Sequence, residues 1–214
     1  MNDEKRTGMD PRAREAALAC KGFLDHDEGL RLFDLARQSA VLGPVLEIGS
    51  YCGKSSVYLG EGARQAGGLL ICLDHHRGSE EHQPGEEYHD PDLYDAEAHL
   101  MDSLTELRRN VRLAGLEETA LLLVARSRAA ANIWSTPLGM VFIDGGHSQQ
   151  AAQDDYQGWA PRIAPGGILA IHDLFPDPNQ GGQAPIEIYR QALQSGLFEE
   201  LPTVKTLGAL RRKP

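Results

Sequence analysis

Short apolar runs alternate with longer amphipathic stretches along most of this chain, and the alternation predicts strands and helices in turn. Residues 45–48 and 69–73 are apolar runs of strand length, and each is followed by a stretch with helical spacing of its apolar positions. Near-continuous apolar strands that alternate with helices are typical of a parallel sheet covered on both faces. The predicted strands are residues 45–48, 69–73, 121–124, 140–143 and 168–171, with an antiparallel pair within 198–210 centred on Pro202 and Thr203.

The predicted helices give the chain a single-domain organisation. Residues 1–42 form an N-terminal helical cap and residues 43–214 form the α/β core. In the long helix expected over residues 96–114, one apolar stripe runs through Leu100, Leu104, Leu107, Val111 and Ala114. The remaining helices are expected at 11–20, 27–41, 55–65, 127–134, a stretch through Ala152, Tyr156, Trp159 and Ile163, and 184–193.

One polar segment interrupts the alternation. From Asp74 to Asp95 the sequence holds four of the eight histidines and eight acids against a single arginine, with few apolar side chains. Loops of this length inside compact domains are usually functional or disordered. We expect residues 75–95 to form a solvated loop over the mouth of an active site.

Charge and composition exclude several classes of function. The chain has 21 Lys and Arg against 31 Asp and Glu, a net charge of −10 over 214 residues, which argues against binding to nucleic-acid backbones. Its apolar runs are far shorter than the roughly 20 residues that cross a bilayer, and the start lacks a signal-peptide pattern, so a cytoplasmic location is expected. Cys20, Cys52 and Cys72 have no metal-ligand spacing and are expected to be buried thiols.

Chemistry-bearing residues follow each predicted strand. Ligands of open parallel sheets bind at the carboxyl ends of the strands, near the point where strand order reverses. Glycines after the first strand allow close backbone approach to a ligand, and Asp74 after the second can accept both hydroxyls of a ribose. Because Tyr51 stands where a dinucleotide turn needs a small residue, NAD is disfavoured. The strand ends therefore indicate a nucleoside-containing cofactor, for which a positively charged amino-acid head group would suit Glu47.

The segment VLEIGSYCGKSS at positions 45–56 resembles the first motif of class I S-adenosylmethionine-dependent methyltransferases. Its Gly-x-Tyr-Cys-Gly-x-Ser form is similar to that of the metal-dependent catechol O-methyltransferase group. The resemblance implies a Rossmann-like α/β fold with a mostly parallel seven-stranded sheet, and S-adenosylmethionine as cofactor. It assigns Glu47, Gly49, Ser50, Tyr51, Gly53 and Ser55 to the methionine part, Asp74 to the ribose, and Ser127 and Arg128 to the adenine.

The same resemblance implies a metal site and a base. Asp144, His172 and Asp173 occupy the positions of the family's metal ligands, with His172 where an acid is usual. Mg²⁺ is the expected ion, and the histidine ligand leaves Mn²⁺ open. His147 stands where the catechol enzymes have a lysine base, and imidazole accepts protons near neutral pH. Lys54, Asp154 and Asp155 are expected to be surface or helix-end residues.

The acceptor is expected to be a small polar molecule that bears a hydroxyl. The polar loop favours a sugar or oligosaccharide, and the chain is similar to small actinobacterial sugar O-methyltransferases that act in polysaccharide biosynthesis. A homodimer through the N-terminal helices fits their apolar faces, while nucleic-acid and membrane partners are not expected. The alternatives are a metal-independent methyltransferase acting on a catechol-like or natural-product hydroxyl, an NAD-dependent oxidoreductase, and a binding protein without turnover.

Overall fold

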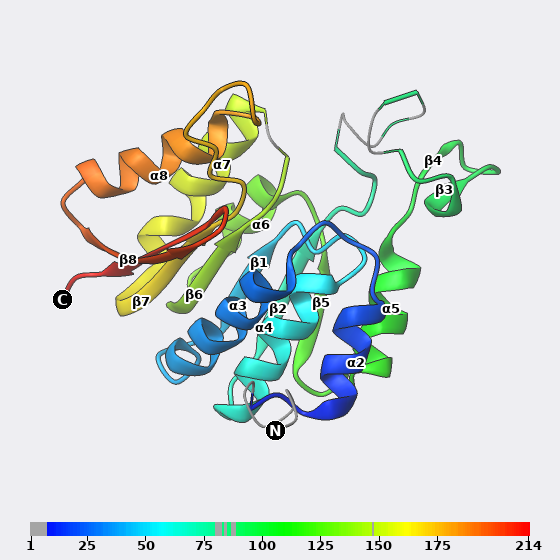
Figure 1. Ribbon diagram of the computed structural model, residues 1–214, viewed down its shortest axis with the longest axis horizontal. Coiled ribbons are helices and arrows are strands. Elements are labelled where there is room, and N and C mark those ends of the chain that lie inside the picture. Colours follow the sequence, from blue (N-terminus) through cyan, green and yellow to red (C-terminus); the bar gives the residue numbers. More distant parts are fainter. Residues whose placement is uncertain (1–7, 80–82, 84, 87–88, 147) are drawn as a thin grey trace.

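The computed structural model of this chain has a central sheet between two layers of helices (Figure 1), and it describes residues 8–79, 83, 85–86, 89–146 and 148–214. The sheet has the strand order β5-β2-β1-β6-β7-β9-β8. The first five strands in this order are parallel, and β9 pairs antiparallel with both β7 and β8. The strand bounds are Val45–Ile48 (β1), Leu70–Asp74 (β2), Ala120–Val124 (β5), Leu138–Ile143 (β6), Ile163–Ile171 (β7), Phe198–Val204 (β8) and Leu207–Arg212 (β9).

Alternation along the strands builds a separate core on each face of the sheet. Successive strand residues point to opposite faces, so Val45 packs in one core and Leu46 in the other. The first core is closed by α2 (Pro11–Ala19), α3 (His26–Ser39), α4 (Lys54–Gln65) and α5 (Leu104–Leu113). The second is closed by α6 (Ser127–Ile133), α7 (Gln149–Trp159) and α8 (Ala184–Gln194). The predicted fold class is confirmed.

The predicted helix over residues 96–114 is wrong in its first half. Residues before Ser103 form η2 (Pro91–Leu93) and a small hairpin of β3 (Tyr94–Asp95) and β4 (Leu100–Met101), set apart from the main sheet (Figure 1). Asp95 accepts the backbone N–H groups of residues 97 and 98, which favours a turn over a helix there. Met101 is buried against a separate small cluster of Cys20, Cys52 and Leu93. The predicted apolar stripe therefore lies on a helix only from residue 104 onward, where α5 begins.

Two further boundaries differ from the sequence prediction. Ile163 belongs to β7 rather than to the preceding helix, because Pro161 follows the end of α7 within η3 (Ala160–Arg162). The closing hairpin turns between Val204 and Leu207, not at Pro202. Pro202 instead lies in the edge strand β8, where the pairing register shifts, a place in which a missing backbone donor is tolerated.

Two simpler expectations concern the thiols and the membrane. Cys20, Cys52 and Cys72 are free and buried, as predicted. Among the helices of the described residues, none has the length and apolar character that crossing a membrane requires.

Candidate active site

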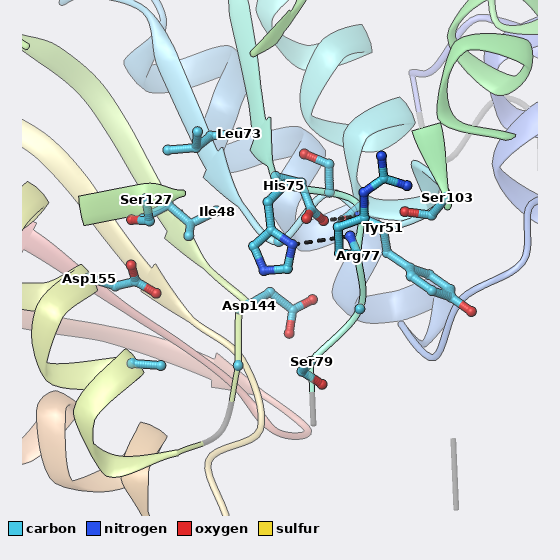
Figure 2. Close-up of a pocket in the computed structure, with 18 of the residues that line it drawn as sticks. Ile48, Tyr51, Leu73, His75, Arg77, Ser79, Ser103, Ser127, Asp144 and Asp155 are labelled. Atoms are coloured by element: carbon cyan, nitrogen blue, oxygen red, sulfur yellow. Dashed lines mark hydrogen bonds between the residues drawn. The ribbon is translucent and has the colours of Figure 1, made fainter. Parts of the chain in front are cut away.

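A cavity of about 770 Å³ opens at the carboxyl edge of the parallel strands. Much of its wall is built by the residues that directly follow β1, β2, β5, β6 and β7, where the order of strands reverses around β1. In the close-up, Tyr51, His75, Ser127 and Asp144 come from the ends of β1, β2, β5 and β6 and lie around the cavity (Figure 2). Predicted site residues on this wall are Gly49, Ser50, Tyr51, Ser55, Asp74, Ser127, Arg128, Asp144, His172 and Asp173.

The turn from β1 to α4 leaves no room for a side chain at its first position. Gly49 has φ of 90°, and a Cβ added there would lie 2.1 Å from the carbonyl oxygen of Asp144. Glycine alone fits both the backbone conformation and this close approach. The glycine therefore lets the turn after β1 lie directly against the end of β6, which brings two walls of the cavity together.

Asp74 at the end of β2 is held by two backbone groups. Its Oδ2 accepts the N–H of Tyr51 at 2.9 Å and its Oδ1 accepts the N–H of His76 at 2.8 Å. A carboxylate has about four acceptor positions, so each oxygen can take one further donor from the cavity. Two neighbouring hydroxyl groups, as in a ribose, match this arrangement.

Asp144, His172 and Asp173 form an acid–imidazole cluster on another part of the wall. Nδ1 of His172 lies 3.1 Å from Asp144 Oδ1 and 3.4 Å from Asp173 Oδ1. One donor atom from each of these residues lies within 4.8 Å of the others, a spacing that a single metal ion can bridge. Burial lowers the pKa of His172, but Asp144, Asp173 and Glu28 together raise it to about 12. Without a cation, the imidazole is therefore positively charged.

Comparison with known proteins identifies the family. The profile of a family described as "Methyltransferase domain" matches residues 46–174, well over half of the chain. The chain belongs to this methyltransferase family. The match begins within β1 and ends just after the His172–Asp173 pair, so it spans every strand end that lines the cavity.

Solved methyltransferase structures share the fold along nearly the whole chain. The O-methyltransferase TomG from Streptomyces achromogenes, involved in tomaymycin synthesis and solved with SAM, is 16% identical with a TM-score of 0.65 and full coverage of both chains. A SAH-bound methyltransferase from Podospora anserina is 15% identical, with a TM-score of 0.66 and coverage of 99% and 92%. An O-methyltransferase from Bacillus cereus with SAH is 18% identical, with a TM-score of 0.62 and coverage of 95% and 91%.

Glu47 and Gly53 are not part of the cavity wall of this methyltransferase. The Glu47 carboxyl group is fully buried on β1 and accepts hydroxyl hydrogen bonds from Ser55 and Ser56 in the first turn of α4. Burial raises its pKa to about 7, although the serine hydrogen bonds oppose the shift. Gly53 precedes α4 with φ of 95°, close to the Leu107 side chain. The structure therefore gives both residues a supporting place behind the β1–α4 turn, and their predicted contact with the methionine part of a cofactor stays a prediction.

Replacing Glu47 with glutamine should change how stability depends on pH. The folded protein keeps the Glu47 proton up to about pH 7, whereas the unfolded chain releases it near pH 4.5. The stabilisation of the folded state by this bound proton is fully present below pH 4.5 and is lost as pH rises through 7. We expect the unfolding free energy of the wild type, relative to Glu47→Gln, to fall by up to about 3 kcal/mol across this range. Denaturant titrations of both proteins at several pH values measure these free energies. A difference between the wild type and Glu47→Gln that stays constant with pH would contradict the prediction.

Ser127 and Asp155 form a polar pair beside Ile48 and Leu73 on the cavity wall (Figure 2). Trp159 Nε1 donates to Ser127 Oγ at 2.8 Å. Asp155 is only 5% exposed, and burial together with neighbouring Asp154 raises its pKa to about 6 despite a hydrogen bond with Ser127. The expectation of a surface position is therefore wrong for Asp155. Its spacing from the apolar residues 152 and 159 places it on the buried face of α7, a signal that the sequence contained.

The polar segment after β2 is more firmly packed than the sequence suggested. His76 is 2% exposed and its Nδ1 lies 2.9 Å from Ser103 Oγ. Lys21 Nζ lies 2.7 Å from both Asp90 and Asp92, which ties this segment to the connection before α3. The predicted base His147 lies outside the described residues, as do residues 80–82, 84, 87 and 88 of the expected 75–95 loop.

Proposed function

We propose that this methyltransferase is S-adenosylmethionine-dependent and transfers the methyl group to a hydroxyl of a small polar acceptor, a sugar or oligosaccharide. The observation that carries the proposal is that one cavity contains both the Asp74 carboxylate and the Asp144, His172 and Asp173 cluster. The Asp74 carboxylate can accept hydrogen bonds from the hydroxyls of a ribose, and the cluster can stabilise an acceptor hydroxyl as it loses its proton. The fold neighbours solved with SAM or SAH support the choice of cofactor.

The wall offers a consistent place for each part of the cofactor. Its methionine part fits the Gly49 to Ser55 turn, its ribose fits Asp74, and its adenine fits Ser127 and Asp155 between the apolar Ile48 and Leu73 side chains. Arg128 also lines this region, where it lies 3.6 Å from Asp154. Bound there, S-adenosylmethionine supplies a methyl group activated by a sulfonium centre.

Asp155 should make cofactor binding depend on pH. As a carboxylate it can accept the amino hydrogen of adenine in a charge-assisted hydrogen bond, and this bond weakens when the group takes up a proton near pH 6. We expect the affinity for S-adenosylhomocysteine to fall by about twofold to fourfold from pH 7.5 to 5.5. The variant Asp155→Asn should have weaker binding at pH 7.5 and a smaller pH dependence. Calorimetric titrations measure both, and equal pH dependence in the two proteins would contradict this role.

The acid–imidazole cluster fits a divalent cation. Two carboxylates and one imidazole nitrogen are a donor set used by Mn²⁺, and the other ring nitrogen of His172 already has a carboxylate partner. Asp144 and Asp173 are 21% and 25% exposed, so both carboxylates are accessible from the cavity. When bound, the cation supplies positive charge that lowers the pKa of a hydroxyl ligand.

The base is proposed from the sequence alone, and the acceptor from residues that line the cavity. His147 is our proposed proton acceptor because it follows Asp144 by three residues in sequence. Polar side chains of His75, Arg77 and Ser103 also line the cavity (Figure 2), and they offer hydrogen-bond partners for a hydroxyl-rich molecule.

One observation favours an aromatic acceptor instead. Phe23 lines the cavity with 68% of its area exposed, and its ring stacks on Tyr51 with a centroid distance of 6.3 Å. An exposed aromatic pair can stack on a catechol-like ring as well as on the apolar face of a sugar. A planar phenolic acceptor is therefore the second candidate.

A panel of sugars and catechols incubated with methyl-labelled S-adenosylmethionine tests the proposal. We expect label transfer to sugar hydroxyls, and loss of transfer on addition of EDTA with recovery on addition of Mg²⁺ or Mn²⁺. Turnover confined to catechols would refute the sugar acceptor, and undiminished turnover with EDTA would refute the metal. Failure of every hydroxyl acceptor in the presence of tight S-adenosylhomocysteine binding would refute O-methyl transfer.

A further inference from the structure

Glu28 is a buried acid that contacts the acid–imidazole cluster from outside the cavity. It stands in the first turn of α3 and is 3% exposed, although an acid at this helical position ordinarily faces water. Its Oε2 lies 3.0 Å from Nε2 of His172, a residue 144 positions later in the chain. Glu28 is not on the cavity wall, so it reaches the site only through His172.

The Glu28 carboxylate is fixed from several sides. Its Oε1 accepts both the N–H and the hydroxyl of Thr206, each at 2.8 Å, and its Oε2 accepts the N–H of Asp25 at 3.3 Å. Both Glu28 oxygens accept hydrogen bonds from backbone N–H groups, so the carboxyl group acts as an acceptor toward His172 as well, and the partner nitrogen Nε2 carries the proton.

This contact decides which ring nitrogen of His172 is free for a cation. With the proton fixed on Nε2, the nitrogen that faces Asp144 and Asp173 is Nδ1. The ring is also held edge-on to Phe142, with a centroid distance of 6.3 Å. Histidine ligands of metals commonly donate their other N–H to a carboxylate, which sets both the tautomer and the ring orientation.

We propose that Glu28 is a positioning residue that holds His172 with Nδ1 directed at a divalent cation shared with Asp144 and Asp173. The inference rests on the metal-assisted form of the proposed function. It gives the N-terminal helix α3 a direct part in the chemistry of a site that is otherwise built from the ends of strands. The competing explanation is structural: Glu28 would only tie α3 to β7 and to the β8–β9 turn.

Calorimetric titration of the full chain with Mn²⁺ separates the two explanations. In Glu28→Gln the carbonyl oxygen can still accept from Thr206, but the amide donates to His172 Nε2 and favours the proton on Nδ1, which blocks the ligand atom. We expect Mn²⁺ affinity to fall about 10- to 100-fold. The matched control is Glu61→Gln, which neutralises a fully buried acid of α4 that pairs with Arg64. It should change Mn²⁺ affinity less than about twofold, whatever its effect on unfolding temperature.

A second measurement does not depend on the folding of any variant. Nitrogen NMR of the wild type with Zn²⁺ bound should show His172 protonated at Nε2 and metal-bound at Nδ1. The reverse assignment would overturn the proposal, as would equal Mn²⁺ affinity in Glu28→Gln and the wild type, or no Mn²⁺ binding by the wild type. Methyl transfer measured on the same samples distinguishes a failure of this inference from a failure of the proposed function. Transfer without Mn²⁺ binding rejects this inference together with Mn²⁺ assistance but not methyl transfer to a hydroxyl, whereas Mn²⁺ binding without transfer to any acceptor rejects only the proposed function.

Discussion

Replacing Asp144 with asparagine should lower kcat for methyl transfer by about a thousandfold. Asp144 is the carboxylate at the end of β6 that faces the cavity and lies 3.1 Å from His172. The change removes one charged donor of the metal cluster and leaves the acceptor hydroxyl without the field that favours its ionisation. S-adenosylhomocysteine affinity should change less than about threefold, because the proposed cofactor contacts lie elsewhere on the wall.

Steady-state kinetics with both substrates saturating measure this loss, and Asp154→Asn is the control. Asp154 also lines the cavity, but it is paired with Arg128 at 3.6 Å and is not a member of the cluster. We expect its kcat to stay within about threefold of the wild type. If Asp144→Asn retained a tenth or more of the wild-type kcat, the cluster would not be the site of hydroxyl activation.

Replacing Asp74 with alanine should weaken binding of S-adenosylhomocysteine by about a thousandfold. Two hydrogen bonds from ribose hydroxyls to a carboxylate are worth about 3 to 6 kcal/mol together, and about 4 kcal/mol corresponds to three decades in Kd. The substitution also removes the acceptor for the N–H groups of Tyr51 and His76. Part of the loss therefore comes from a less ordered β1–α4 turn.

The control for Asp74 is Asp95→Ala, measured by the same calorimetric titration. Asp95 likewise accepts two backbone N–H groups, those of Glu97 and Ala98, but it lies outside the cavity wall. It should lower the unfolding temperature without changing Kd by more than about twofold. A Kd for Asp74→Ala that stays within tenfold of the wild type would show that the ribose is bound elsewhere.

The sequence was sufficient to place the strand ends around one cavity. Apolar runs of strand length gave the parallel strands, and parallel strands bring their carboxyl ends to one edge of the sheet. For that reason Asp74, Asp144 and His172 could be assigned to a common site from residue order alone, and the structure does bring them to one wall. The resemblance to methyltransferases drawn from residues 45–56 is confirmed by the family match.

The remaining features depend on packing that residue order does not encode. In the sequence Glu28 resembles an ordinary acid in the first turn of a helix. Only the packing of α3 near the end of β7 brings it into contact with His172, which lies 144 positions later in the chain. From the sequence, Glu47 is expected to contact the cofactor. In the structure, each of its carboxylate oxygens accepts a hydrogen bond from a serine in the first turn of α4. The 94–101 hairpin has too few paired residues to show a strand period in the sequence, and its Met101 is buried in a cluster with Cys20 and Cys52, which are distant in the sequence.

An anomalous difference map of crystals grown with S-adenosylhomocysteine and Mn²⁺ tests whether metal and cofactor share one cavity. We expect a manganese peak bonded to Asp144, His172 Nδ1 and Asp173, in the same cavity as the cofactor, with the ribose on Asp74. Manganese bound away from these three residues, or the cofactor sulfur outside this cavity, would refute the shared site.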